Sequence, residues 1–271
     1  MPLLELNGLH LRAGARTLVE PLSLRIETGE QVALIGASGA GKTSLLHAFA
    51  LALRPAAGTL RLARREAWTL SSRERHGLRR ELMLAPQHPP LPPRQRVATA
   101  VLAGRLPGAS MAESLRMLFS PSAAQARLAF EALERLELGG RLWSRVDQLS
   151  GGERQRVALA RLLVSKAGLW LADEPLSALD PQRAQRVLVV LQDAARTQGR
   201  TLVCSLHQVD LACRAFPRVI ALREGRLVYD GPPQALGVRE LDEIYADLLN
   251  ETPPPGDDAP ERAAPPQAMC R

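Results

Sequence analysis

The fold of this chain is decided by the stretch Gly36-Ala37-Ser38-Gly39-Ala40-Gly41-Lys42-Thr43, which matches the phosphate-loop pattern G-x-x-x-x-G-K-[ST] at every fixed position. The apolar run 31–35 precedes it and an apolar-periodic segment follows it, which predicts a strand, a glycine-rich loop and a helix. In such a loop successive backbone N–H groups point into one concavity at a helix N-terminus, and this concavity binds phosphate.

Two side chains of this loop carry specific chemistry. Lys42 supplies a point charge for terminal phosphates, and the Thr43 hydroxyl is placed to bind Mg²⁺. A glycine-rich turn that matches the pattern by accident is the alternative, and motifs further along the chain argue against it. The predicted nucleotide-binding residues of this region are Gly36, Ala37, Ser38, Gly39, Ala40, Gly41, Lys42, Thr43 and Ser44.

The composition is that of a soluble globular protein: 271 residues with 46% hydrophobic content. No apolar run approaches the about 20 residues of a membrane span, and the N-terminus has no secretion-signal pattern, so we expect a cytoplasmic protein. The three cysteines, Cys204, Cys213 and Cys270, are odd in number and lack a C-x-x-C spacing. They indicate neither a disulfide framework nor a zinc site, and we interpret them as buried thiols and a tail residue.

The formal net charge of +7 raises the question of a nucleic-acid partner. The basic residues are almost all arginines scattered along the chain, and aromatic residues make up only 3%. Stacking platforms for bases are therefore not expected, and we do not predict a nucleic-acid site.

The order of elements predicts an α/β fold with a mostly parallel sheet. We expect strands at 4–11, 22–26, 31–35, 58–62, 82–85, 169–173, 201–205 and 219–222. The early strands alternate apolar and polar residues and should form an antiparallel β subdomain. Helical patterns from 97 to about 163, including a long helix over 123–136 capped by Ser122, predict an inserted helical subdomain at about 88–163.

Two further helices should lie between the later strands, one beginning at Pro181 and one over 209–215. We place the folded domain at 1–250, and the Pro- and Ala-rich segment 251–271 has the composition of a disordered tail.

A pair of carboxylates, Asp173 and Glu174, follows the apolar residues 169–172. A lone Asp-Glu pair is more often a solvated turn. At the end of a buried strand near a phosphate loop, however, this pair suits metal binding by Asp173 and general-base catalysis by Glu174.

The segment Leu149-Ser150-Gly151-Gly152-Glu153-Arg154-Gln155 predicts a second anion site, because a serine and two glycines open a helix there. One nucleotide does not need two such sites from one chain. With the phosphate loop, the run 173–175, the run 177–180 and His207, this signature occurs in the order and approximate spacing of the ABC ATPases, which the chain resembles from about Leu3 to Leu249.

The resemblance implies a P-loop NTPase fold and hydrolysis of ATP with Mg²⁺ between two copies paired head to tail. Ser150, Gly151 and Gly152 of one copy would close over the γ-phosphate held by Lys42 of the other. Asp180 resembles the residue that connects the two sites across the dimer.

The resemblance assigns two further residues to catalysis. Gln87 resembles the loop glutamine that senses Mg²⁺ and the attacking water, and His207 resembles the switch histidine that contacts the γ-phosphate. An ordinary polar loop residue and a core or surface histidine are the alternatives. The implied sites are therefore catalytic at Glu174, His207 and Gln87, and metal-binding at Thr43, Gln87 and Asp173.

The chain departs from the family where an aromatic side chain usually stacks on adenine. The corresponding segment, 12–16, reads Arg-Ala-Gly-Ala-Arg. The guanidinium of Arg12 or Arg16 can cover the base instead, because such planes stack on π systems, and we predict weakened selectivity for adenine.

Within the family the chain looks most like the ATP-binding subunits of phosphonate-type importers, through the segments 103–106, 206–210, 221–226 and 241–245. This implies uptake of a phosphonate or a related phosphorus oxyanion. It also implies a homodimer at the cytoplasmic face of the inner membrane, bound peripherally to integral membrane permeases and served indirectly by a periplasmic solute-binding protein. The alternative is a soluble ABC ATPase that acts on DNA or as a regulator, but the chain has no long heptad insertion or zinc-hook cysteine pair.

Overall fold

The computed structural model describes residues 2–237. The predicted tail at 251–271, Cys270, the segment 241–245 and the end of the predicted domain at 250 lie outside the described residues. No helix among residues 2–237 is both long enough and apolar enough to cross a bilayer.

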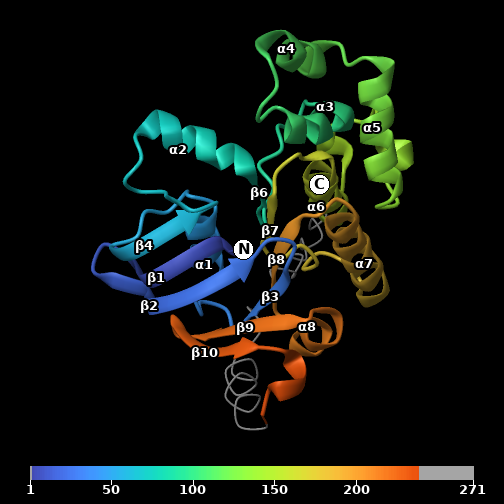
Figure 1. The fold of residues 1–271 in the computed structure, drawn as a ribbon. Helices are drawn as coiled ribbons and strands as arrows, with labels where there is room; N and C mark the ends of the chain where they lie inside the picture. Colours follow the sequence, from blue (N-terminus) through green and yellow to red (C-terminus); the bar gives the residue numbers. More distant parts are fainter. Residues whose placement is uncertain (1, 238–271) are drawn as a thin grey trace, which may run out of the picture.

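The described part of the chain alternates strands and helices (Figure 1). The strands are β1 (Pro2–Ala13), β2 (Arg16–Glu27), β3 (Gln31–Ile35), β4 (Ala57–Leu62), β5 (Arg65–Glu66), β6 (Leu82–Ala85), β7 (Leu169–Ala172), β8 (Thr201–Leu206), β9 (Arg218–Arg223) and β10 (Arg226–Gly231). The α-helices are α1 (Lys42–Phe49), α2 (Ser72–Leu78), α3 (Val97–Leu102), α4 (Met111–Phe119), α5 (Ala123–Glu134), α6 (Gly151–Val164), α7 (Pro181–Thr197) and α8 (Val209–Ala215). Short 3₁₀ helices lie at Arg79–Glu81, Ala103–Arg105, Gly139–Arg141, Val146–Gln148 and Pro233–Ala235.

A six-stranded sheet in the order β10-β9-β3-β8-β7-β6 forms the centre of the molecule. Its strands pair in parallel except for β10, which is antiparallel to β9. The predicted mostly parallel α/β sheet is confirmed. Parallel strands end at one edge of the sheet, so the residues that follow β3, β6, β7 and β8 are brought together there.

Successive residues of β3 enter two different hydrophobic cores, because strand side chains alternate between faces. Val32 and Leu34 pack into the core shared with α1 and the antiparallel sheet β2-β1-β4-β5. Ala33 and Ile35 pack into the core formed with helices α3 and α5 to α8. The phosphate loop after β3 is therefore anchored from both faces of the sheet.

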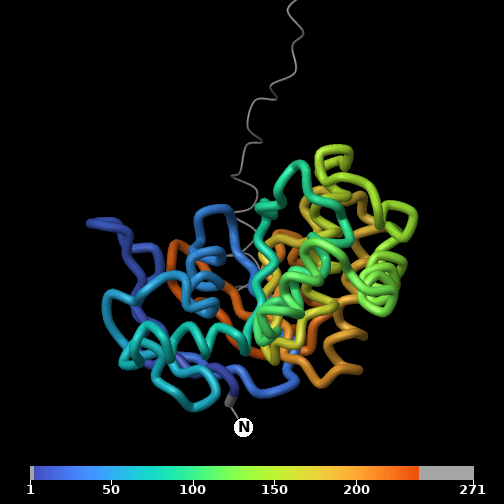
Figure 2. Tube along the Cα trace, turned by 90° about the horizontal axis from the view of Figure 1, so that it is seen from above, coloured from blue at the N-terminus to red at the C-terminus, as the bar shows by residue number. Residues whose placement is uncertain are grey.

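The helices α3 to α6 follow β6 and precede β7, and α3 to α5 lie away from the antiparallel sheet in both views (Figures 1 and 2). Helix α6 packs against α3 and α5. The Ser122 hydroxyl accepts a hydrogen bond from the Gln125 N–H, as expected for the cap of α5. The predicted end of this helix at Leu136 is wrong: α5 ends at Glu134, and Glu137 has a left-handed φ of 58°.

Among the strands and α-helices of the described residues, three were not predicted from the sequence, namely β5, β10 and α2. Helix α2 buries only Leu78, so it has no apolar periodicity, and a reciprocal capping box between Ser71 and Glu74 stabilises its start. The cysteine interpretation also needs a correction: Cys204 is buried, but Cys213 is only half-buried on the short helix α8.

Candidate active site

The phosphate loop requires glycine at two positions where the backbone is crowded and left-handed. Gly36 has a φ of 146°, and a Cβ there would lie 2.2 Å from the Leu222 carbonyl oxygen. Gly41, the N-cap of α1, has a φ of 101°, and its Cβ would lie 2.7 Å from the Leu18 carbonyl oxygen. Any larger residue would push the loop away from the sheet, so these glycines fix the shape of the cradle.

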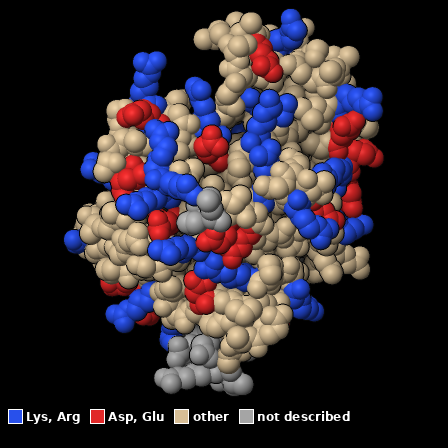
Figure 3. Space-filling view, in the orientation of Figure 1, with Lys and Arg blue, Asp and Glu red and all other residues tan. Residues whose placement is uncertain are grey.

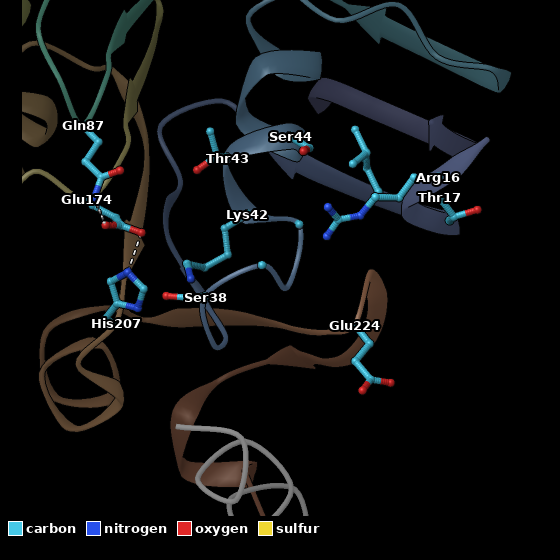
Figure 4. Close-up of a pocket in the computed structure, with 13 residues that line it drawn as sticks. Arg16, Thr17, Ser38, Lys42, Thr43, Ser44, Gln87, Glu174, His207 and Glu224 are labelled. Carbon is cyan, nitrogen blue, oxygen red and sulfur yellow. Dashed lines mark hydrogen bonds and ion pairs between the residues drawn. The ribbon is translucent and has the colours of Figure 1, made fainter. Parts of the chain in front are cut away.

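Lys42 extends across this loop, and its ammonium group lies inside the curve (Figure 4). The side chain is 4% exposed, and Nζ donates hydrogen bonds to the carbonyl oxygens of Gly36 at 2.7 Å and Ala37 at 3.0 Å. These hydrogen bonds hold the ammonium group beside the loop, where an anion would bind.

A cavity of about 580 Å³ opens above the loop, which is within the range of small-molecule sites. Of the predicted residues, it is lined by Ser38, Gly39, Gly41, Lys42, Thr43, Ser44, Gln87, Glu174 and His207. Gly36, Ala37 and Ala40 shape the loop behind this lining. The structure therefore brings three strand ends, those of β6, β7 and β8, to the phosphate loop (Figure 4).

Asp173 directly follows β7 and is 2% exposed. Its Oδ1 accepts hydrogen bonds from the Thr43 hydroxyl at 3.3 Å and from the Ser205 hydroxyl at 2.7 Å. A carboxylate beside a threonine hydroxyl is an oxygen donor set that suits Mg²⁺, which takes its remaining ligands from phosphates and water. The residues present therefore fit the predicted metal.

The carboxylate of Glu174 is held from two sides. His207 Nε2 lies 2.5 Å from Oε1, and the Gln87 amide donates to Oε2 at 2.5 Å. Burial raises the pKa of Glu174, but the hydrogen bond and charge of His207 and the charges of Lys42 and His88 outweigh it, so the pKa lies below its ordinary value. Glu174 is therefore ionised at neutral pH and can accept a proton from water.

Two polar side chains that lie at this site were assigned no role from the sequence. Ser205 is fully buried in β8, and Gln155 is 3% exposed in α6. Ser205 accepts a hydrogen bond from the Glu174 N–H at 2.8 Å, and Gln155 donates to the Glu174 carbonyl oxygen at 2.6 Å. A polar residue inside a fully buried strand was the available signal for Ser205, because such a group needs a partner.

The second predicted anion site lies outside the cavity. The Ser150 hydroxyl caps α6 by accepting from the Glu153 N–H, and the Glu153 carboxylate accepts from the Ser150 N–H at 2.9 Å. That last hydrogen bond is the main reason why the pKa of Glu153 is lowered. Ser150 and Gly151 are exposed, and Gly152 is half-buried.

Asp180 is likewise outside the cavity, where its carboxylate accepts from the Arg183 N–H at 2.9 Å and caps α7. Within one chain, then, the structure does not bring Ser150, Gly151, Gly152 or Asp180 to the phosphate loop.

The two arginines considered for adenine differ in the structure. The Arg12 guanidinium donates to the nearby Ala15 carbonyl oxygen at 3.2 Å. Arg16 instead lines the cavity beside Thr17, on the side of the loop away from Glu174 (Figure 4). Of the two, only Arg16 lines the site.

Comparison with known proteins decides the family. The profile described as ABC transporter matches residues 19–177. The chain belongs to the ABC transporter family. The resemblance to the ABC ATPases and the predicted P-loop ABC ATPase fold are confirmed. The chain is an ATP-hydrolysing, nucleotide-binding transport ATPase of this family.

Curated relatives from bacteria match nearly the whole chain. The Phosphonates import ATP-binding protein PhnC of a Polaromonas species is 51% identical over 262 residues, which is 95% of this chain and 94% of that protein. The Phosphonates import ATP-binding protein PhnC 2 of Pseudomonas aeruginosa is 49% identical, over 90% of this chain and 91% of that protein.

Solved structures of ABC proteins share this fold. The post-hydrolysis dimer of the ATP-binding cassette MJ0796, bound to ADP and phosphate, is 26% identical with a TM-score of 0.72, over 85% of this chain and 98% of that chain. A bacterial Atm1-family ABC exporter with ATP bound is 25% identical with a TM-score of 0.74, over 92% of this chain and 41% of that chain.

Proposed function

We propose that this ABC ATPase energises the uptake of a phosphonate or a related phosphorus oxyanion. The observation that carries the proposal is the 51% identity to a phosphonate-import ATP-binding protein over 94% of that protein's length. The alternative of an ATPase acting on DNA gains no support, and basic and acidic side chains are interspersed on the face seen in Figure 3.

In this proposal the residues of the cavity have separate roles in ATP hydrolysis. Lys42 and the loop N–H groups bind the terminal phosphates and stabilise the charge that develops during transfer. Glu174 accepts a proton from the attacking water, while His207 and Gln87 orient its carboxylate. Mg²⁺, held by Thr43 and Asp173 with Gln87 nearby, would neutralise charge on the phosphates.

A second copy of the chain completes each site. Ser150, Gly151 and Gly152 open a long helix outside their own cavity, and Ser150 and Gly151 are exposed, which suits donation of N–H groups to a phosphate bound by another copy. Asp180 would lie between the two sites. We place the ATPase domain at 1–250, with the helical subdomain inserted at about 88–163.

The partners follow from the role of an import ATPase. We propose that the homodimer binds integral membrane permeases at the cytoplasmic face of the inner membrane and that a solute-binding protein acts indirectly through them. The helical subdomain and the Gln87 loop would transmit the motion of the dimer to the permease.

The proposed function is tested by reconstituting the chain with its permeases in vesicles. We expect the ATPase rate to rise with the permeases, and to rise further with solute-binding protein loaded with a phosphonate. Double-stranded DNA without permeases serves as the comparison. Stimulation by DNA, together with no response to permeases or phosphonate, would contradict the proposal.

The absence of an aromatic side chain where the family usually stacks one on adenine leads to a separate prediction. A guanidinium plane at Arg16 covers any base, so we expect ATP and GTP to differ by less than about tenfold in kcat/KM. Steady-state kinetics with both nucleotides measure this ratio. Arg16→Ala should raise KM for both nucleotides, whereas Arg12→Ala is the matched control. A preference for ATP of more than about tenfold would show that the aromatic is dispensable for selectivity.

A further inference from the structure

The backbone of Glu174 adopts a conformation that an L-residue rarely occupies. Its φ is 45°, in the left-handed region. Strained conformations of this kind persist only where surrounding contacts over-determine them, and they concentrate at functional sites. Contacts around this peptide must therefore hold it in place.

Two buried side chains hold the peptide of Glu174 from opposite ends. The Ser205 hydroxyl accepts from the Glu174 N–H at 2.8 Å and donates to Asp173 Oδ1 at 2.7 Å. The Gln155 amide nitrogen donates to the Glu174 carbonyl oxygen at 2.6 Å. The Glu174 carbonyl oxygen also accepts longer hydrogen bonds from the Ser177 hydroxyl at 3.1 Å and the Ser177 N–H at 3.3 Å. The two buried side chains therefore supply the shortest hydrogen bond at each end of this residue.

Gln155 has all of its polar atoms engaged with the segment that follows Glu174. Its amide nitrogen also donates to the Ser177 hydroxyl at 3.3 Å, and its carbonyl oxygen accepts from the Ala178 N–H at 3.2 Å. The orientation of the amide is consistent with all of these partners, since its oxygen faces a donor and its nitrogen faces acceptors. We call these three hydrogen bonds from Gln155 to residues 174–178 the bracket.

The bracket connects Glu174 to the start of α6. Gln155 lies in the second turn of that helix, whose first turn carries Ser150, Gly151 and Gly152. Gly152 also touches this segment, because a Cβ there would lie 2.8 Å from the Ala178 carbonyl oxygen. A shift of the helix start would thus move the peptide of Glu174.

We infer that Gln155 is a positioning residue that holds Glu174 in its left-handed conformation and couples it to the start of α6. The inference rests on the proposed function, in which Glu174 is the general base. In the proposed dimer the start of α6 contacts the nucleotide bound by the second copy, so Gln155 links that nucleotide to the general base of its own chain. Without the bracket, the Glu174 peptide relaxes, and the carboxylate loses its alignment with His207 and Gln87.

The test compares Gln155→Met with two other variants. Methionine has a similar length but makes none of the three hydrogen bonds. Gln192→Met is the matched control, because the Gln192 amide also donates to a backbone carbonyl oxygen, that of Ala215 at 2.8 Å, away from the active site. Gln155→Glu keeps the acceptor for the Ala178 N–H but loses both donations from the amide nitrogen, and it provides a second variant if the methionine variant does not fold.

For Gln155→Met or Gln155→Glu we expect kcat to fall about 10- to 100-fold while KM for ATP changes less than about twofold. Gln192→Met should retain the wild-type kcat. In the Glu174→Gln background, measured by single-turnover hydrolysis, Gln155→Met should lower the residual rate no further, because both changes act through one group.

Two results would overturn the inference: a folded Gln155 variant with a kcat within about twofold of wild type, or an equal fold-loss in the Glu174→Gln background. In either case, if the Glu174→Gln variant does not hydrolyse ATP, Glu174 keeps its role as general base and the proposed function is not contradicted. Turnover that survives Glu174→Gln would instead contradict the role of Glu174 itself, and the inference with it.

Discussion

Replacing Glu174 with glutamine is expected to lower ATP turnover by about 10²- to 10⁴-fold, while ATP still binds. The amide cannot accept a proton from water, but it has nearly the shape of the carboxylate and can still contact His207 and Gln87. The lowered pKa of Glu174 supports this expectation, because the wild-type residue is ionised at neutral pH. Phosphate release and nucleotide binding, measured on the same sample, distinguish a loss of turnover from a loss of ATP binding.

The matched control is Glu131→Gln, which removes an exposed carboxylate paired with Arg127 on α5. Such surface pairs contribute little, so turnover should stay at the wild-type level. Normal hydrolysis by Glu174→Gln would remove Glu174 from the role of general base.

Replacing Lys42 with alanine is expected to reduce kcat/KM for ATP by about 10²-fold or more, chiefly through lost phosphate binding. The loop would lose the only positive side chain that lies buried against Gly36 and Ala37 in the described residues. Lys42→Arg should also fail, since a planar guanidinium is larger and presents its donors as a fork rather than as a compact point charge. Binding of labelled ATP and steady-state hydrolysis measure the loss.

Lys166→Ala is the natural control, because Lys166 is the other lysine of the chain and is exposed. It should bind and hydrolyse ATP like wild type. Tight ATP binding by Lys42→Ala would mean that the loop N–H groups suffice without the ammonium.

Much of the fold was predictable because buried segments show a clear apolar pattern. The strands at 31–35 and 82–85 and the helix over 209–215 have the predicted bounds, and the helix that begins at Pro181 starts where expected. Helix α2 could not be predicted in this way because only Leu78 is buried there, so its stability comes from capping and not from an apolar face.

The part of the active site that lies at the ends of parallel strands was predictable, because such strands end at one edge of the sheet. Gln87, Glu174 and His207 each follow a predicted strand, and the structure joins them through hydrogen bonds. Ser205 and Gln155 were not predictable, because their partners depend on the order of β7 and β8 and on the packing of α6. Neither contact follows from spacing along the chain.

The central claim is that each active site needs two copies of this chain, since the phosphate loop and the start of α6 do not share a cavity. Light scattering of the Glu174→Gln variant, with ATP and with ADP, tests this claim most directly. With ATP we expect twice the chain mass of 29.4 kDa, and with ADP the mass of the single chain. A single-chain mass with ATP, together with wild-type hydrolysis whose rate per chain is independent of protein concentration, would contradict the claim.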